Sequence, residues 1–256
     1  MVVQHNLSAM NTNRQLGTVT SSLSKSTEKL SSGYKINRAA DDAAGLSISE
    51  KMRSQIRGLD KSASNAQDGI SLIQVAEGAL NETHSILQRM NELATQAAND
   101  TNTSIDRTAI SAEMNQLTSE INRIQSTTQF NTMNLLDGTF TSKNLQVGAM
   151  SGQTIVISVT KMSASNIGVS GLSVSSNTNA GKAMSKIQLA IQSVSAQRSK
   201  LGAIQNRLEH TINNLEATSE NTSSAESRIR DTDMAKEMVN YSKNNILAQA
   251  GQSMLA

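Results

Sequence analysis

Apolar residues recur at helical spacing near both ends of the chain. Near the start they are Leu16, Val19, Leu23 and Leu30, and near the end they are Ile187, Val194, Leu201, Leu208 and Leu215. Steps of three, four and seven residues place such side chains on one face of an α-helix. The pattern therefore predicts helical packing stripes at both ends, which suit an elongated protein that assembles side by side with its own copies.

The longest helical pattern covers about residues 43–98. One row at seven-residue spacing consists of Gly45, Met52, Leu59, Ala66, Ile73, Leu80, Leu87 and Ala94. A second row consists of Ile48, Gln55, Ser62, Gly69, Ala76, Thr83, Met90 and Ala97, and Leu72, Ala79, Ile86 and Leu93 form a third. A stripe this wide predicts that the helix contacts more than one neighbour. Asp41 and Asp42 precede it, where capping carboxylates are favoured.

The remaining pattern predicts four more helices around one strand region. A first helix over 5–31 ends at a Ser-Ser-Gly signal, and a third follows the polar break at 99–102. A fourth helix covers about 178–220, and a polar stretch over 221–233 leads into a last helix from about Met234. Over 130–175, alternating apolar residues and the turn dipeptides Asp137-Gly138 and Ser151-Gly152 predict a β-hairpin region. The expected fold is mainly α, with long antiparallel helices forming a coiled-coil or rod core and a small β-hairpin region in the middle.

Composition supports this fold class over a compact enzyme. Among 256 residues, 37% are hydrophobic and only 2% aromatic, and Trp, Pro and Cys are absent. A globular core of this size normally uses more aromatic side chains, whereas narrow helical seams pack Ala, Leu, Ile and Met. Without Cys, the chain has no disulfides and no thiolate metal sites.

Charge and hydropathy patterns indicate neither a nucleic-acid partner nor membrane insertion. The net charge is +2, and the basic residues Lys51, Arg53, Arg57 and Lys61 alternate with Glu50 and Asp60. This mixture is typical of a solvated helix face rather than a phosphate-binding stripe. No apolar run reaches the roughly 20 residues that span a bilayer. The N-terminus lacks the features of a signal peptide, so export would not use the general secretory route.

Candidate catalytic and metal-binding residues fail on spacing. His5, His84 and His210 have no second ligand at the spacing that zinc requires. The Asp41-Asp42 pair is better explained as a helix cap than as an acid–base pair. Phosphate-binding, dinucleotide-binding and serine-nucleophile motifs are absent. We therefore expect no catalytic residues, no metal site, no cofactor and no enzymatic activity.

Several long strings nevertheless resemble one family, the bacterial flagellins. At the N-terminal end these are Glu28–Gly33 (EKLSSG), Ile36–Leu59 (INRAADDAAGLSISEKMRSQIRGL), Asn65–Asp100 and Thr128–Gly138 (TQFNTMNLLDG). At the C-terminal end these are Gln197–Leu215 and Ala225–Met238 (AESRIRDTDMAKEM). Because these non-repeating strings agree in order over nearly the whole chain, the resemblance is specific.

The resemblance implies a structural subunit that polymerises into the flagellar filament for motility, secreted and extracellular. It implies an N-terminal filament-core helix and loop over 1–42, and rod-domain helices with the hairpin region over 43–178. A returning rod helix over 179–222 and a C-terminal filament-core helix over 223–256 complete the division. Only about 140–178 remains for the variable outer domains, which implies a short flagellin. The self-assembly residues expected on the terminal helices are Leu16, Val19, Leu23, Leu30, Met238, Ile246 and Leu247.

The family's partners follow from the same resemblance. They are other flagellin subunits in a homopolymer, a flagellin export chaperone acting before type III export, and the filament cap and hook-associated proteins. Toll-like receptor 5 is also an expected partner, through Arg89, Leu93 and Glu113. Many strong activators carry a second Arg where this chain has Asn91, which predicts weaker activation. The alternative is that these are ordinary polar and apolar residues of a helix face.

Two other classes compete with a filament subunit. A hook–filament junction protein of the same superfamily shares the helices, but the string at 225–238 favours flagellin itself. A soluble coiled-coil adaptor would share the heptads without needing a hairpin. The flagellins that this chain resembles continue for roughly another helical stretch beyond a segment like Gln252–Ala256, so the sequence given is expected to be shortened in its C-terminal helix. Whether the protein itself ends at Ala256 or the sequence is trimmed stays open, and only if the stretch is absent from the protein is polymerisation expected to be weakened.

Overall fold

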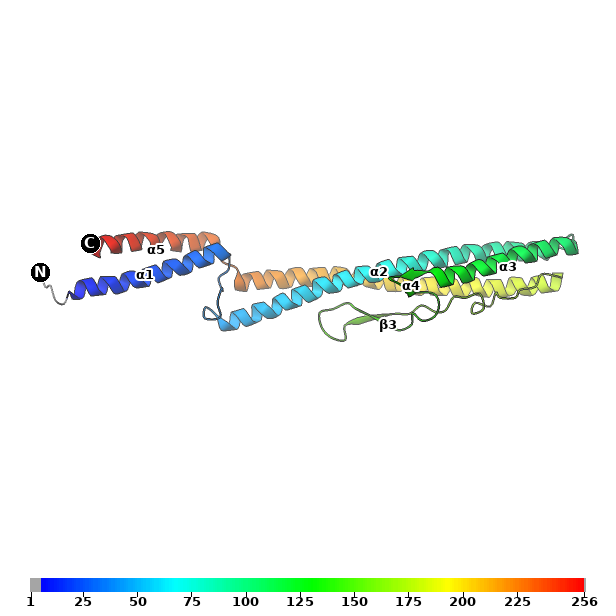
Figure 1. The fold of residues 1–256 in the computed structure, drawn as a ribbon, viewed down its shortest axis with the longest axis horizontal. Helices are drawn as coiled ribbons and strands as arrows, with labels where there is room; N and C mark the ends of the chain where they lie inside the picture. The colour runs from blue at the N-terminus through cyan, green and yellow to red at the C-terminus, as the bar shows by residue number, and fades with distance from the viewer. Residues whose placement is uncertain (1–5, 256) are drawn as a thin grey trace. The chain divides into compact units, whose positions relative to one another are not determined.

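The computed structural model describes the backbone of residues 6–255 (Figure 1). Within them lie five helices: α1 (Leu7–Ser32), α2 (Ala43–Ala97), α3 (Ser104–Thr127), α4 (Asn177–Arg230) and α5 (Met234–Leu255). Four short strands lie between α3 and α4: β1 (Gln129–Phe130), β2 (Met133–Asn134), β3 (Lys143–Gln146) and β4 (Thr154–Ile157). The predicted mainly α fold with a small hairpin region is confirmed. The predicted start of the first helix at His5 lies outside the described residues.

The chain forms two compact units. One comprises residues 1–57 together with 218–256, and the other comprises residues 58–217. We call the first the terminal unit and the second the central unit. Since α2 and α4 each contribute residues to both, every unit contains segments from both halves of the chain.

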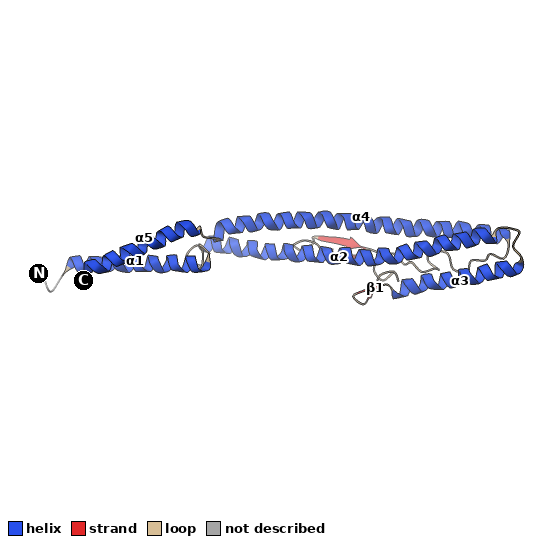
Figure 2. Ribbon diagram, turned by 90° about the horizontal axis from the view of Figure 1, so that it is seen from above, coloured by secondary structure: helices blue, strands red, loops and turns tan. Residues whose placement is uncertain are grey.

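In the central unit, α2 and α4 run antiparallel and α3 lies alongside α2 (Figures 1 and 2). A Cβ added to Gly69 of α2 would lie 3.4 Å from Leu208 Cδ1 of α4, and Glu77 pairs with Arg198 at 3.5 Å. Residues later in α2 therefore contact residues earlier in α4, as expected for antiparallel helices. The core between the helices is continuous, and its fully buried side chains include Ile73, Leu80, Leu87, Met114, Ile121, Ile187, Leu201 and Leu208.

The apolar rows predicted on α2 are correct only along part of the helix. From Ser62 to Ala97 the second row is buried. Before that, Ile48 and Gln55 are exposed, and Ser49 is buried instead. The reason is a change of neighbour, because Ser49 donates a hydrogen bond to Glu226 of α4 at 2.7 Å within the terminal unit.

The strand region holds two hairpins rather than one. As predicted, β3 and β4 pair antiparallel across the turn at Ser151-Gly152, with Leu145 opposite Ile155. The sequence prediction missed the small β1–β2 hairpin, whose two turn residues Asn131 and Thr132 both have positive φ, 47° and 64°. Residues 158–175 form loops and turns in place of the strand continuation predicted there.

The hairpin β3–β4 packs against both long helices. Asn65 of α2 donates a hydrogen bond to the Gln146 carbonyl at 3.2 Å, and Gln197 of α4 donates to the Ser158 carbonyl at 3.2 Å. A Cβ on Gly69 would overlap Leu145 of β3. Gly69 therefore leaves room for the Leu145 side chain between the hairpin and α2.

The helix ends around the first loop mostly match their sequence signals. Gly33, with φ of 76°, ends α1 and donates its N–H to the Lys29 carbonyl at 2.9 Å. Asp42 accepts a hydrogen bond from Gly45 N at 2.9 Å, which is the predicted capping role. Asp41 does not join the cap, because its carboxylate accepts from the N–H groups of Asn37 and Arg38 inside the loop.

The fourth helix is longer than predicted. The polar stretch from residue 221 was expected to be non-helical, but α4 continues to Arg230. This stretch contains no Gly or Pro to break a helix, and Glu226 and Arg230 are both held by side chains of α2. The break before α5 is confined to residues 231–233, and the predicted start at Met234 is confirmed.

Candidate assembly and receptor-contact surfaces

Helices α1 and α5 pack against each other in the terminal unit (Figure 1). Three predicted assembly residues, Leu16, Val19 and Leu247, line a hollow of about 420 Å³ at this contact together with Gly251. A Cβ on Gly251 would lie 3.2 Å from Leu16 Cδ1, so the glycine lets the helices approach closely. The structure therefore brings residues from the two ends of the sequence together.

The pair leaves most of its apolar surface uncovered in the single chain. The described buried side chains are Ser26 on α1 and Ala248 on α5. The predicted residues Met238, Ile246 and Leu247 are 52%, 66% and 45% exposed. Leu16, Val19, Leu23 and Leu30 are half-buried. Further exposed apolar residues, which were not among the predicted assembly residues, are Leu7, Met10, Met234, Val239 and Met254.

A second, more polar groove of about 690 Å³ lies between α1 and the loop that follows it. The small residues Gly17, Ser21 and Ser24 line it from one helix face. Glu28 of α1 and Arg38 of the loop also line it and pair with each other at 2.9 Å. Asp41 lies at the groove as well, and hydrogen bonds from the backbone N–H groups of Arg38 and Asn37 hold the pKa of its carboxyl below the usual value.

The predicted receptor residues Arg89 and Glu113 meet across α2 and α3 of the central unit. Arg89 Nη2 lies 3.0 Å from Glu113 Oε1, and its Nη1 lies 3.1 Å from Glu92 Oε2. Hydrogen bonds to these carboxylates, first that to Glu113, raise the pKa of Arg89. Leu93 is only 2% exposed and packs in the core. The surface that the three residues share therefore consists of the charged pair, with Leu93 supporting α2 from inside.

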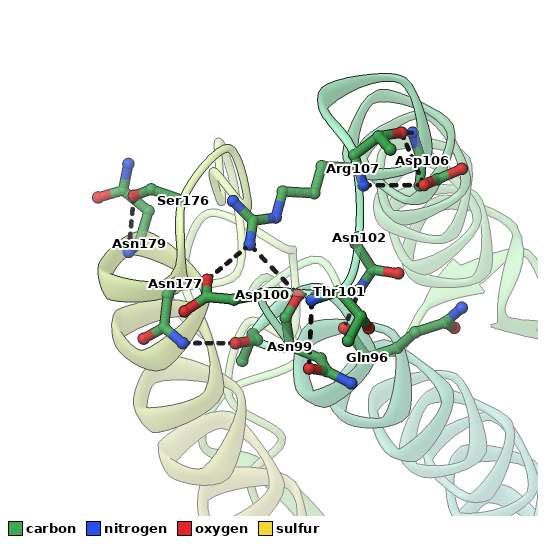
Figure 3. A network of polar contacts seen from close by, with 12 residues as sticks. Gln96, Asn99, Asp100, Thr101, Asn102, Asp106, Arg107, Ser176, Asn177 and Asn179 are labelled. Atoms are coloured by element: carbon green, nitrogen blue, oxygen red, sulfur yellow. Dashed lines mark hydrogen bonds and ion pairs between the residues drawn. The ribbon is translucent and has the colours of Figure 1, made fainter.

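A polar network joins the ends of α2, α3 and α4 (Figure 3). Arg107, whose side chain is 15% exposed, contacts Asp100 Oδ1 at 3.1 Å and the Asn99 carbonyl at 3.3 Å. Asn177 Nδ2 at the start of α4 donates to the Ala98 carbonyl at the end of α2.

Thr103 and Asp106 form a capping box at the start of α3. From the sequence, residues 99–102 are predicted only as a helix break. The spacing of Thr103 and Asp106 was the signal that could have located the cap.

Residues 6–255 contain no cluster of three or more His, Asp and Glu side chains suited to a metal ion. His84 lies beside Gln88 at 3.1 Å, and His210 is exposed on α4. His5 lies outside the described residues. Over the same part of the chain, none of the helices combines the length and apolar character required to cross a membrane.

Comparison with known proteins gives consistent matches at both ends. The bacterial flagellin N-terminal helical region matches residues 3–141, and the bacterial flagellin C-terminal helical region matches residues 184–256. A flagellin of Halalkalibacterium halodurans is 56% identical over 258 residues, covering 100% of this chain and 95% of that protein. A flagellin of Bacillus subtilis is 48% identical over 290 residues, with the same coverage of 100% and 95%.

A solved structure extends the likeness to the fold. The crystal structure of Bacillus cereus flagellin matches with a TM-score of 0.55 and 32% sequence identity, covering 64% of this chain and 94% of that one. Full-length similarity to flagellins favours a flagellin over the hook–filament junction protein and the coiled-coil adaptor. The chain belongs to the bacterial flagellin family and is a structural subunit that polymerises with other flagellin subunits into the flagellar filament outside the cell.

Proposed function

We propose that this flagellin polymerises by covering the exposed apolar faces of α1 and α5 with the same helices of other copies. The main support for this proposal is the exposure of Met238, Ile246 and Leu247 on α5, because packing against α1 leaves these apolar side chains open to solvent. Burying apolar surface stabilises an assembly by about 25 cal/mol per Å². Several such side chains per subunit, repeated along a filament, provide a large driving force.

The groove beside α1 supports this arrangement. Its stripe of Gly17, Ser21 and Ser24 has no large side chain to keep a neighbouring helix at a distance. Lys25 and Asp41 also line the groove and offer opposite charges. An apolar helix face of another copy would pack against the stripe, while the charges favour one register over others.

Seeded elongation tests this proposal. The change Ile246→Ser on α5 is compared with Leu189→Ser on α4, because the two side chains are similarly exposed, at 66% and 61%. We expect Ile246→Ser to slow elongation by roughly tenfold, as loss of about 1.4 kcal/mol of contact energy would do. Leu189→Ser should elongate like the unchanged chain. Equal elongation by all three proteins would contradict the proposal.

We infer that the same face of α5 is the part that an export chaperone covers before type III secretion. Exposed apolar patches promote unwanted association, so a subunit held before export needs them shielded. A purified flagellin chaperone should bind the chain less tightly after Met238→Ser, as measured by calorimetry. Unchanged binding would reject α5 as the contact. In the assembled flagellum, the filament cap and hook-associated proteins are the expected partners at the filament ends.

We further propose that the Arg89–Glu113 pair is a contact for Toll-like receptor 5. Both side chains are about half exposed, and two hydrogen bonds from Arg89, through Nε and Nη2, hold Glu113 in place. Arginine is also frequent among the hot-spot residues of protein interfaces. Asn91 stands where a second Arg would add charge, so activation should be moderate.

The matched control for this contact is Arg123, which also forms an exposed ion pair, with Glu120 of α3. Arg89→Ala should raise the concentration needed for half-maximal receptor signalling by roughly tenfold, in the range of interface hot spots. Arg123→Ala should leave signalling unchanged. Signalling that is equally strong after Arg89→Ala would reject this contact.

A further inference from the structure

The two connections that carry the terminal helices lie side by side in the terminal unit. One joins α1 to α2, and the other, at residues 231–233, joins α4 to α5. Lys35 N donates to the Arg230 carbonyl at 2.7 Å, and Thr232 N donates to the Gly33 carbonyl at 2.9 Å. Tyr34 and Asp231 form an isolated antiparallel bridge between these bonds. Backbone hydrogen bonds thus tie the two connections together.

The side chain of Arg230 reinforces this tie at three points. Its Nη1 lies 2.7 Å from Glu50 Oε1 and 3.4 Å from Ser49 Oγ, both on α2. Its guanidinium carbon lies 4.8 Å from the ring centroid of Tyr34. Only 13% of the side chain is exposed. One residue at the end of α4 therefore holds the start of α2 and the loop after α1 at once.

The surroundings engage the edge and the face of the guanidinium, while its buried Nε has no hydrogen-bond partner. A planar, permanently charged group can pair with a carboxylate at its edge and stack on an aromatic ring with its face, whereas an ammonium cannot reproduce both contacts. Tyr34 supplies the ring in a chain that has only two Tyr and two Phe. Ser49, fully buried, adds a bond from α2 to Glu226 one turn earlier on α4.

We propose that Arg230 is a positioning residue for filament assembly, because it locks the two connections together and so fixes the direction in which α1 and α5 leave them. This inference rests on the proposed role of α1 and α5 as the assembly faces. A small angular change at the connections has a large effect at the helix ends. With 26 residues, α1 is roughly 39 Å long, so a swing of about 10° moves its far end by roughly 7 Å.

The test compares Arg230→Ala and Arg230→Lys with Arg228→Ala in the full chain. Arg228 is an exposed residue of the same helical turn, and its contact is a bond to Ser224 of its own helix at 3.2 Å. Seeded elongation rates and filament helical parameters from electron microscopy are measured for each, with helicity followed by circular dichroism.

Arg230→Ala should slow elongation by roughly tenfold, within the range over which interface variants change association rates, and alter or broaden the filament pitch. Arg230→Lys should restore part of the rate because it keeps the charge near Glu50. Arg228→Ala should match the unchanged chain. Filaments of Arg230→Ala with the original rate and pitch would overturn the inference.

Two further variants keep the result decisive. If Arg230→Ala loses helicity, the inference is tested with Glu50→Gln instead. This change is made at an exposed residue, removes the ion pair with Arg230 and keeps a hydrogen-bond acceptor. A broadened pitch in Glu50→Gln supports the inference, and an unchanged pitch overturns it. Ile246→Ser separates this idea from the proposed assembly faces. If it blocks elongation while Arg230→Ala does not, the positioning role alone fails; if neither variant changes elongation, the proposed faces fail as well.

Discussion

The terminal helix pair and the central unit use the same apolar residue types but bury them very differently. Helix α4 alone buries eight apolar side chains and Gln197 within residues 58–217, including Ile187, Leu201 and Leu208. On α1 and α5 the described buried residues are Ser26 and Ala248. The central unit is thus stabilised by its own contacts, whereas the terminal pair leaves most of its apolar surface exposed in the single chain, as its proposed role in assembly requires.

The number of neighbours explains this difference. In the central unit, α2 contacts α3, α4 and the β3–β4 hairpin, so a wide apolar stripe is covered on several sides. In the terminal unit, α1 packs chiefly against α5. A single helical neighbour covers only a narrow seam. The rest of each apolar face is therefore open to solvent in the single chain.

Removing one core side chain gives the largest expected effect. Leu87→Ala in α2, where the leucine is fully buried, should lower the free energy of unfolding by about 2–5 kcal/mol in chemical denaturation. Leu23→Ala in α1, where the leucine is half-buried, should lower it much less and should slow seeded elongation instead. Equal losses of stability would mean that the two regions do not differ as described.

A pair of glycine substitutions sharpens the comparison. Gly17 on α1 and Gly78 on α2 both have open space where a Cβ would be added. Each change to Ala should stabilise its helix by roughly 0.5–1 kcal/mol in thermal unfolding. Only Gly17→Ala should also slow elongation, because its methyl group narrows the groove that we assign to another subunit. Elongation by Gly17→Ala as fast as that by Gly78→Ala would argue against that groove.

A local effect, confined to the central unit, concerns the cap of α3. Thr103→Ala should lower stability by about 1 kcal/mol in denaturation experiments, since Thr103 accepts from the backbone N–H of Asp106. Hydrogen bonds from the Thr103 hydroxyl and N–H hold the pKa of Asp106 below its usual 3.8. The carboxylate's contribution is therefore complete above pH 3.8 and is lost as the pH falls through the lower pKa of the folded chain.

Nuclear magnetic resonance titration checks this cap directly. In the unchanged chain, Asp106 should titrate below 3.8, and after Thr103→Ala its pKa should rise toward that value. Elongation should be unaffected, because the cap belongs to the central unit. A pKa of Asp106 that does not respond to the substitution would show that Thr103 is not its main partner.

Periodicity predicted the elements whose neighbours run along their whole length. The buried row of α2 from Leu59 to Ala94, the start of α5 and the hairpin that turns at Ser151-Gly152 agree with the predictions from the sequence pattern. Periodicity did not predict segments whose structure depends on contacts with residues far away in the sequence. The last turns of α4 are polar in sequence and are held by Ser49 and Glu50, 177 and 180 residues away.

The candidate surfaces show the same limit. Arg89 and Glu113 were predicted together from a family resemblance, and their ion pair depends on how α3 lies on α2. Spacing along the chain does not give that arrangement. The Arg230 contacts were not predicted, because they join three segments that are far apart in sequence. The β1–β2 hairpin was not predicted from the sequence, because its turn residues Asn131-Thr132 lack the glycine of the strongest turn signals.

Hydrogen exchange of single amides, measured in the isolated subunit and in seeded filaments, tests the central claim most directly. In the subunit, amides of α1 and α5 should exchange quickly, and those of α2 and α4 within residues 58–217 slowly, because only the latter lie over a closed core. On assembly, α1 and α5 should become protected to the level of the central unit. Terminal helices that are equally protected in both states would contradict the account.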